Sequence, residues 1–344
     1  MNNPNHHALL GCLLGTALGD ALGLPAERLS RTRVAAMRMG TDHRFVLGRG
    51  MFSDDTEHTL MLAAALIKHG EDAAALQRSF AWKLRWWLLA LPAGVGLSTA
   101  KSILRLWMGF PVATAGVQSA GNGAAMRSAI VGVVFCDDAA RRHEFALAAC
   151  RVTHRGPRAE ESALLVAEAA ALAVRRTPAR QILATLEPLI QSKEMRIRFG
   201  ALKASLGQGV SVACYAERIG CGHGVSGFAP NSVAVALYAW LRHRGDFAQA
   251  IREVIACGGD TDTVAAITGG ICGAEVGESG IPQPWITGIW EWPRSVSYIR
   301  RVADALASGE QHAPRLFWPA IPFRNLLFLL IVLLHGFRRL LPPY

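Results

Sequence analysis

Apolar residues that recur with a helical period are the feature that most limits what this chain can fold into. In residues 57–69 the apolar positions repeat every three or four residues, Lys68 and His69 occupy the last turn, and Gly70 follows. The same pattern predicts four further helices, over 158–175, 231–243, 246–256 and 263–276. No alternating apolar–polar run is long enough for a sheet, so the sequence predicts an all-α fold.

The composition is that of a globular protein with a large core. Of the 344 residues, 51% are hydrophobic and 18% charged, which excludes a disordered chain. The formal net charge of +10 favours anionic partners such as nucleotides or phosphorylated ligands, unless the surface is simply rich in arginine. The basic residues are scattered and form no block, so a nucleic-acid-binding arm is not favoured.

Cysteine usage and the first residues indicate a cellular compartment. The seven cysteines are odd in number, irregularly spaced and without a C-x-x-C motif, which argues against disulfides or a zinc site. The first seven residues lack the charged and apolar regions of a signal peptide. We therefore expect a reducing, cytoplasmic location.

The end of the chain carries an apolar run of nine residues, over 326–334. A membrane span needs about 20 such residues, so we expect a helix docked on the domain, with a dimer or partner contact and a membrane-surface anchor as alternatives. Trp82 and Trp86 pose a similar question. Their spacing places them on one helix face, which is more often a core face than a partner surface.

Two acidic motifs each precede a predicted helix: Ser53-Asp54-Asp55-Thr56 and Gly259-Asp260-Thr261-Asp262-Thr263. Either motif alone is explained as well by helix capping. As a pair they indicate more, because two carboxylates so close repel each other unless a cation or a proton lies between them. Oxygen ligands without His or Cys suit Mg²⁺, Mn²⁺ or Ca²⁺ better than zinc.

A glycine-rich segment, Gly121-Asn122-Gly123-Ala124-Ala125-Met126-Arg127-Ser128, leads into an apolar helix. Such a turn is either a plain loop or an anion cradle made by backbone N–H groups. Arg127 then pairs with phosphate or lies on the surface. Three further candidates, His154 in Thr153-His154-Arg155-Gly156, Asp20 and Glu27, have equally good structural explanations on their own.

The order of these motifs resembles the ADP-ribosylglycohydrolase family, which includes dinitrogenase-reductase-activating glycohydrolases and ADP-ribosyl-acceptor hydrolases. The likeness covers residues 8–306, and residues 314–344 form an extension beyond it. It implies a compact all-α orthogonal bundle with a cleft for two Mg²⁺ or Mn²⁺ ions. The positions that match the metal ligands are Ser53, Asp54, Asp55, Asp260, Asp262 and Thr263, with Ser53 where the family usually has Thr.

The resemblance also implies roles around the metals. Asn122, Gly123, Ala124, Arg127, His154 and Phe228 match positions that contact the substrate, although Tyr or Trp is commoner than Phe at the last one. Asp55, Asp262 or Glu27 would take or give the proton, and Glu27 approaches the metals or gates the site in some members.

The implied activity is removal of ADP-ribose from a modified acceptor, with a protein arginine favoured. Serine-linked ADP-ribose, O-acetyl-ADP-ribose and ADP-ribosylated nucleic acid or guanidine remain alternatives. So do an inactive protein that binds ADP-ribose or blocks a transferase, and a phosphoesterase with two-metal chemistry. Immunity proteins with this fold exist, so an ADP-ribosyltransferase toxin is a candidate partner. No role for residues 314–344 follows from the family.

Overall fold

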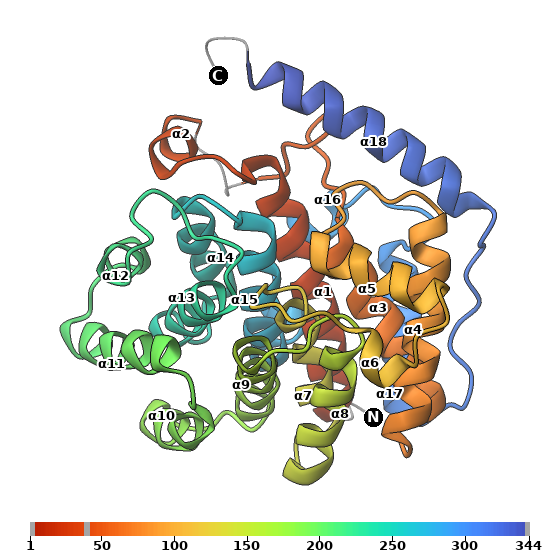
Figure 1. Ribbon diagram of the computed structural model, residues 1–344. Coiled ribbons are helices and arrows are strands. Elements are labelled where there is room, and N and C mark those ends of the chain that lie inside the picture. Colours follow the sequence, from red (N-terminus) through yellow and green to blue (C-terminus); the bar gives the residue numbers. More distant parts are fainter. Residues whose placement is uncertain (1–3, 38–41, 341–344) are drawn as a thin grey trace.

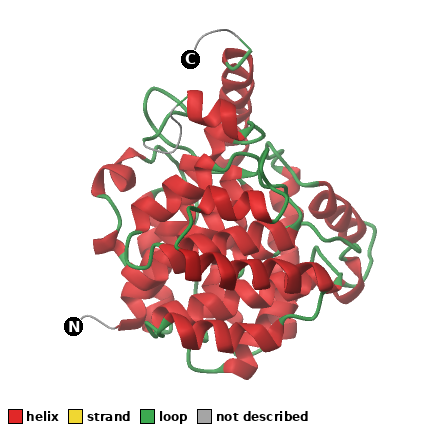
Figure 2. Ribbon diagram, turned by 90° about the vertical axis from the view of Figure 1, so that its left-hand side faces the viewer, coloured by secondary structure: helices red, strands yellow, loops and turns green. Residues whose placement is uncertain are grey.

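The computed structural model of the protein describes residues 4–37 and 42–340, and these form eighteen α-helices and no strand (Figure 1, Figure 2). This confirms the all-α prediction. The helices are α1 (Pro4–Gly23), α2 (Arg31–Ala36), α3 (Asp54–His69), α4 (Ala73–Leu89), α5 (Leu97–Trp107), α6 (Val112–Ala115), α7 (Ala129–Val134), α8 (Ala139–Arg151), α9 (Pro157–Val174), α10 (Ala179–Leu186), α11 (Lys193–Gln208), α12 (Val212–Arg218), α13 (Ala229–Arg242), α14 (Phe247–Ala256), α15 (Thr261–Val276), α16 (Gln283–Gly288), α17 (Val296–Ser308) and α18 (Ala320–Arg338).

The five helices predicted from periodicity correspond to α3, α9, α13, α14 and α15. The largest difference is at the start of α3, which begins three residues before the predicted position. Asp54 and Asp55 therefore lie in its first turn and not ahead of it. The reason is that the cap of this helix comes from a distant residue, as described below.

The centre of the molecule is an antiparallel pair of helices, α1 and α15 (Figure 1). Both are apolar around their whole circumference, which is typical of fully buried helices. Glycines let the two backbones touch: a Cβ on Gly15 would collide with the backbone of Gly269, and one on Gly19 with that of Ala265. Helices α3, α7, α9, α13, α14 and α17 pack around this pair.

The tryptophans of α4 divide between the core and the surface. Trp87 is fully buried, but Trp82 and Trp86 are 54% and 42% exposed. The two share a face as predicted, with ring centroids 5.8 Å apart. Their expected place in the core is wrong, because α4 turns the face of Trp87 inward, where its indole N–H donates to Glu57.

Helix α18 runs along one edge of the molecule (Figure 1) and is docked on the domain, as expected for the apolar run. Its side chains Arg324, Asn325 and Phe328 are buried against the domain. Within residues 4–37 and 42–340, two helical stretches are apolar enough by length and composition to cross a membrane: residues 6–26, whose most apolar part is buried in the core, and α18, of which a third is buried.

Candidate active site

Neither acidic motif caps its own helix. Ser53 stands at the N-cap of α3 and Asp260 at that of α15, yet neither side chain makes a capping hydrogen bond. Elsewhere the chain uses true caps, as when Asp72 accepts from the backbone N–H of Ala75. Helix capping by these side chains therefore explains neither motif, and the carboxylates are available to bind a ligand.

The cap of α3 is supplied by Asp20 of α1. Its carboxylate accepts hydrogen bonds from the N–H of Ser53 at 2.9 Å, the N–H of Thr56 at 3.1 Å and the hydroxyl of Thr56 at 2.6 Å. Burial raises the pKa of Asp20 to about 6, against the opposing effect of these bonds. Asp20 thus fixes the start of α3 and positions the acids that follow it.

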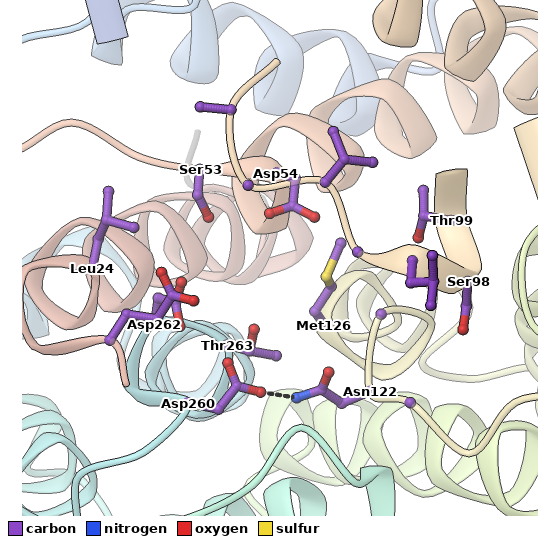
Figure 3. A pocket seen from close by; sticks show the side chains of 18 of the residues that line it. Leu24, Ser53, Asp54, Ser98, Thr99, Asn122, Met126, Asp260, Asp262 and Thr263 are labelled. Carbon is purple, nitrogen blue, oxygen red and sulfur yellow. Dashed lines mark hydrogen bonds between the residues drawn. The ribbon is translucent and has the colours of Figure 1, made fainter. Parts of the chain in front are cut away.

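Carboxylates from three segments gather where α3 and α15 begin (Figure 3). Burial raises the pKa of Asp54, Asp55 and Asp262 well above the usual value, and neighbouring carboxylates raise it further. Burial also raises the pKa of Glu27, although Arg28 lies 3.2 Å away and opposes the shift. The cluster is therefore short of positive charge.

Hydroxyls lie among these acids. Asp55 Oδ2 accepts from Ser53 Oγ at 3.1 Å and from Thr263 Oγ1 at 3.4 Å, which links α3 to α15. Asp55 Oδ1 and Asp262 Oδ1 are buried and have no hydrogen-bond partner. A buried carboxylate oxygen without a partner is costly, so both atoms are suited to bind a cation.

The donor set fits hard divalent ions. As the side chains stand, no group of three or more His, Cys, Asp or Glu that could hold an ion occurs in the described part of the chain. The hydroxyls of Ser53 and Thr263 would therefore have to share the ligation with the carboxylates. An all-oxygen set of this kind suits Mg²⁺ or Mn²⁺.

A cleft of about 490 Å³ opens beside the acids (Figure 3), a size typical of small-molecule sites. Glu27, Asp54, Asp260, Asp262 and Thr263 line one part of it. Gly121, Asn122, Gly123 and His154 line another. The structure thus brings most of the predicted site residues to one cavity, although they are up to 236 positions apart, as Glu27 and Thr263 show.

The Gly-rich loop is held against α15 and around His154. The Asn122 side-chain amide donates to Asp260 Oδ2 at 2.6 Å and to Ser232 Oγ at 2.9 Å. His154 is buried, with Nδ1 2.8 Å from the Thr153 hydroxyl. A Cβ on Gly123 would stand 3.0 Å from the imidazole, so glycine leaves room for the ring. Burial and, to a smaller extent, the positive charge of Arg127 lower the pKa of His154 to about 3. The ring is therefore neutral at pH 7.

Three predicted substrate contacts lie outside the cleft lining. Arg127 is 1% exposed and donates to the carbonyls of Gly123 and Ala149 and to the Thr153 hydroxyl. These bonds hold the loop in place, so the expected placement of Arg127 on the surface is wrong, while its pairing with phosphate stays a prediction. Ala124 is buried behind the loop, and Phe228 stands at the start of α13 with Arg198 over its ring.

Other lining residues were not predicted. The segment 93–99, with Gly94 and Gly96, borders the cleft, and so do Phe328 and Val332 of α18. The two glycines were a signal for a loop beside a ligand. Nothing local in the apolar run indicates that α18 reaches the site.

The anchor of α18 also reaches the acidic motif. Arg324 forms a buried ion pair with Glu291, and a second at 3.6 Å with Glu57. Arg324 donates to the carbonyl of Phe52 at 2.7 Å, while Glu291 accepts from the Phe52 N–H at 3.1 Å. Both backbone groups of Phe52, directly before Ser53, are therefore held by this pair.

Comparison with known proteins agrees with the geometry. The family model described as ADP-ribosylglycohydrolase matches residues 1–315. The chain belongs to the ADP-ribosylglycohydrolase family. Two of the relatives described below carry the names of ADP-ribosyl hydrolases, and the chain is an enzyme of this class, which hydrolyses glycosidic bonds. The match ends before α18, which therefore lies outside the family core.

The chain resembles several curated relatives. It is 32% identical to an uncharacterised protein of Archaeoglobus fulgidus, covering 81% of this chain and 90% of that one. It is 28% identical to ADP-ribosyl-[dinitrogen reductase] glycohydrolase of Rhodospirillum rubrum, covering 89% and 98%. It is 26% identical to ADP-ribosylarginine hydrolase Tri1 of Pseudomonas putida, covering 86% and 76%. A solved ADP-ribosylglycohydrolase-related protein complex matches with a TM-score of 0.70 and 28% identity over 89% of this chain and 98% of its own.

Proposed function

We propose that the protein is a divalent-metal-dependent hydrolase that removes ADP-ribose from arginine side chains of proteins. The observation that carries the proposal is the pair of buried, partnerless oxygens Asp55 Oδ1 and Asp262 Oδ1 beside the cleft. Structural acids are normally paired or hydrogen-bonded when buried. Asp55 Oδ1 and Asp262 Oδ1 accept no hydrogen bond, which favours a role in binding cations.

Two segments would hold the ions: Ser53, Asp54 and Asp55 from the start of α3, and Asp260, Asp262 and Thr263 from the start of α15. When bound, Mg²⁺ or Mn²⁺ would supply Lewis-acid chemistry, activating water and gripping sugar hydroxyls. Asp20 keeps the α3 segment in place, because its carboxylate is bound to Ser53 and Thr56. Asn122 does the same for Asp260.

The rest of the cleft would bind and orient the ADP-ribosyl group. Gly121 and Gly123 present backbone without side chains, so a diphosphate can approach closely. The neutral imidazole of His154 can hydrogen-bond to the substrate without adding charge. Arg28, 85% exposed at its side chain beside Glu27, contributes a cation at the mouth.

Proton transfer falls to the carboxylates that face the cleft. Cleavage of a ribosyl bond passes through an oxocarbenium-like state, and the leaving nitrogen takes up a proton. Glu27 lines the cleft, and burial raises its pKa, so its carboxyl holds a proton more readily than an ordinary exposed glutamate. Asp262, which also lines the cleft, and Asp55, which is not among the lining residues, are the alternatives for this role, but both are also assigned as ligands.

Two observations favour arginine as the acceptor: the Pseudomonas relative is named an ADP-ribosylarginine hydrolase, and so is one of Serratia proteamaculans. A relative named ADP-ribosylhydrolase ARH3, from Gallus gallus, keeps other linkages open. An immunity role against an ADP-ribosyltransferase toxin would follow from arginine hydrolysis and is part of the same proposal.

The test is release of free ADP-ribose from ADP-ribosyl-arginine, ADP-ribosyl-serine and O-acetyl-ADP-ribose, with Mg²⁺, Mn²⁺ or EDTA. We expect release from the arginine conjugate that EDTA abolishes. Asp54→Ala combined with Asp262→Ala should abolish it as well. Release unaffected by EDTA would contradict the metal site, and tight ADP-ribose binding without turnover of any conjugate would identify an inactive binding protein.

A further inference from the structure

The outward face of α18 is more apolar than the face that packs on the domain. The inward side carries Arg324, Asn325 and His335, whose imidazole lies 3.1 Å from the carbonyl of Pro25. The outward side carries only large apolar residues over most of its length, with these exposed fractions: Phe323 75%, Leu326 59%, Leu327 48%, Leu330 51%, Leu333 49%, Leu334 68% and Phe337 67%. A helix at a protein–water surface shows the opposite arrangement.

Aromatic residues extend this face at the N-terminal end of α18. Phe317 is 60% exposed and lies beside Trp292, which is 59% exposed, with the ring centroids 5.8 Å apart and the rings tilted by 40°. Trp318 is also partly exposed, at 41%. A contiguous exposed apolar surface of this kind marks an interaction site and not the scattered exposure of ordinary proteins. Tryptophans are enriched where proteins meet the boundary between lipid and water.

The charged residues that the end of the chain contributes have one sign. Residues 311–344 contain no Asp or Glu, and besides Arg324, which is buried against the domain, they include Arg315, Arg338 and Arg339. Arg33 of α2 donates to the carbonyl of Arg339 at 2.8 Å, which adds another guanidinium at the C-terminal end of the helix. The apolar face is thus flanked by cations.

We propose that the outward face of α18 docks on an anionic lipid surface, with the helix lying in the plane of the head groups. An apolar helix face flanked by arginines is the pattern that binds such surfaces. The helix lies on the membrane and does not cross it, because its inward face is tied to the domain through the buried Arg324–Glu291 pair. Pairing of α18 with the α18 of a second copy is disfavoured, since residues 311–344 contain no acid that could face the other copy's arginines.

Docking would bring the cleft close to the membrane. Phe328 and Val332, on the inward side of the same helix, line the cleft beside the acidic cluster. One helix would then contact lipid on one side and border the active site on the other. This places the enzyme beside membrane-associated substrates, whichever acceptor it cleaves, and so the inference does not depend on the proposed acceptor.

The test is flotation of the full-length protein with vesicles of phosphatidylcholine alone or of phosphatidylcholine mixed with phosphatidylglycerol. We expect binding to the mixed vesicles, and a loss of about tenfold or more on Leu330→Glu combined with Leu334→Glu, because charges oppose insertion of the face. Ile197→Glu on α11 is the matched control, since Ile197 is 60% exposed on another helix. It should bind like the unmodified protein.

Three results would overturn the proposal. The first is no binding to either vesicle by the unmodified protein. The second is equal binding to neutral and mixed vesicles, which would show that the outward face of α18 does not require anionic lipid. The third is a dimer by light scattering that the double variant converts to a monomer, which would identify a second copy as the occupant. Thermal unfolding of the double variant should match the unmodified protein, because both replaced residues are exposed.

Discussion

The side-chain amide of Asn122 donates a hydrogen bond of 2.6 Å to the carboxylate of Asp260, joining the Gly-rich loop to the start of α15. Asn122→Asp would place two acids at this distance, while Asn122→Ala would only remove the bond. We expect kcat/KM to fall about tenfold in the alanine variant, as for loss of a hydrogen bond to a charged group, and about 100-fold or more in the aspartate variant. Steady-state hydrolysis of ADP-ribosyl-arginine measures both. Equal losses in the two variants would argue against the electrostatic explanation.

Neutralising the acidic cluster should have opposite effects with and without metal. Asp55→Asn and Asp262→Asn each remove a charge from mutually repelling buried carboxylates. In EDTA we expect the free energy of unfolding to rise by about 1–3 kcal/mol. With Mg²⁺ the unmodified protein should gain stability through binding, and the variants should gain much less.

Urea unfolding with and without Mg²⁺ provides this measurement. Asp304→Asn is the control, because the side chain of Asp304 is 61% exposed and pairs with His6 far from the cluster. It should change stability little in either condition. Variants that are destabilised in EDTA would show that these carboxylates are structural acids.

The buried pair of Arg324 and Glu291 should decide whether α18 stays docked. Arg324→Met leaves the Glu291 carboxylate buried without its cation, which we expect to cost about 3–5 kcal/mol of unfolding free energy. Adding Glu291→Gln should restore part of the loss. Because the pair also holds Phe52, hydrolase activity should fall with Arg324→Met.

A matched control is Arg300→Met, which breaks an exposed pair with Glu278. Exposed pairs contribute about 0–1 kcal/mol, so this variant should stay close to the unmodified protein. Limited proteolysis between α17 and α18 would report undocking directly. If Arg324→Met and Arg300→Met lose equal stability, the anchor is unimportant.

His154 should make the protein less stable in acid. Its pKa in the folded protein is about 3, below the ordinary value of 6.5, so unfolding takes up a proton between these two pH values. The free energy of unfolding therefore falls as the pH drops below 6.5, and the contribution of His154 to this fall is up to about 1.4 kcal/mol per pH unit. Above pH 6.5 the titration of His154 no longer affects the free energy of unfolding.

His154→Gln should show a shallower decline between pH 7 and pH 5 in urea unfolding, whereas His312→Gln, at an exposed position, should not differ from the unmodified protein. If the free energy of unfolding declines with pH equally in the unmodified protein and in His154→Gln, the imidazole has the same pKa in the folded and the unfolded state.

The sequence was sufficient for the all-α class, for five of the helices and for a list of candidate site residues, most of which line one cleft. Helical periodicity is local, so α3, α9, α13, α14 and α15 could be predicted within a few residues. Asn122, His154, Asp260 and Asp262 could be grouped only through the family resemblance, because nothing local shows that their segments meet. Their catalytic and ligand roles stay predictions.

What could not be predicted depends on contacts between distant segments. The capping of α3 by Asp20 requires that α1 passes beside Ser53, and no spacing within either segment shows this. The burial of Arg127 depends on Phe80 of α4 and on Thr153, which follows α8. The wall formed by Phe328 and Val332 depends on an anchor to Glu291 that only the folded chain reveals.

The glycines between α1 and α15 have a consequence for how this protein can change over evolution. Asp20 and Asp262 sit on these two helices, so the separation of their carboxylates is set by backbone contact at Gly15 and Gly19. A methyl group at either position would push the helices apart and with them the acids. Substitutions at positions that do not contact the substrate can therefore abolish activity. Substitutions that accumulate on the surface leave the spacing of the acids unchanged.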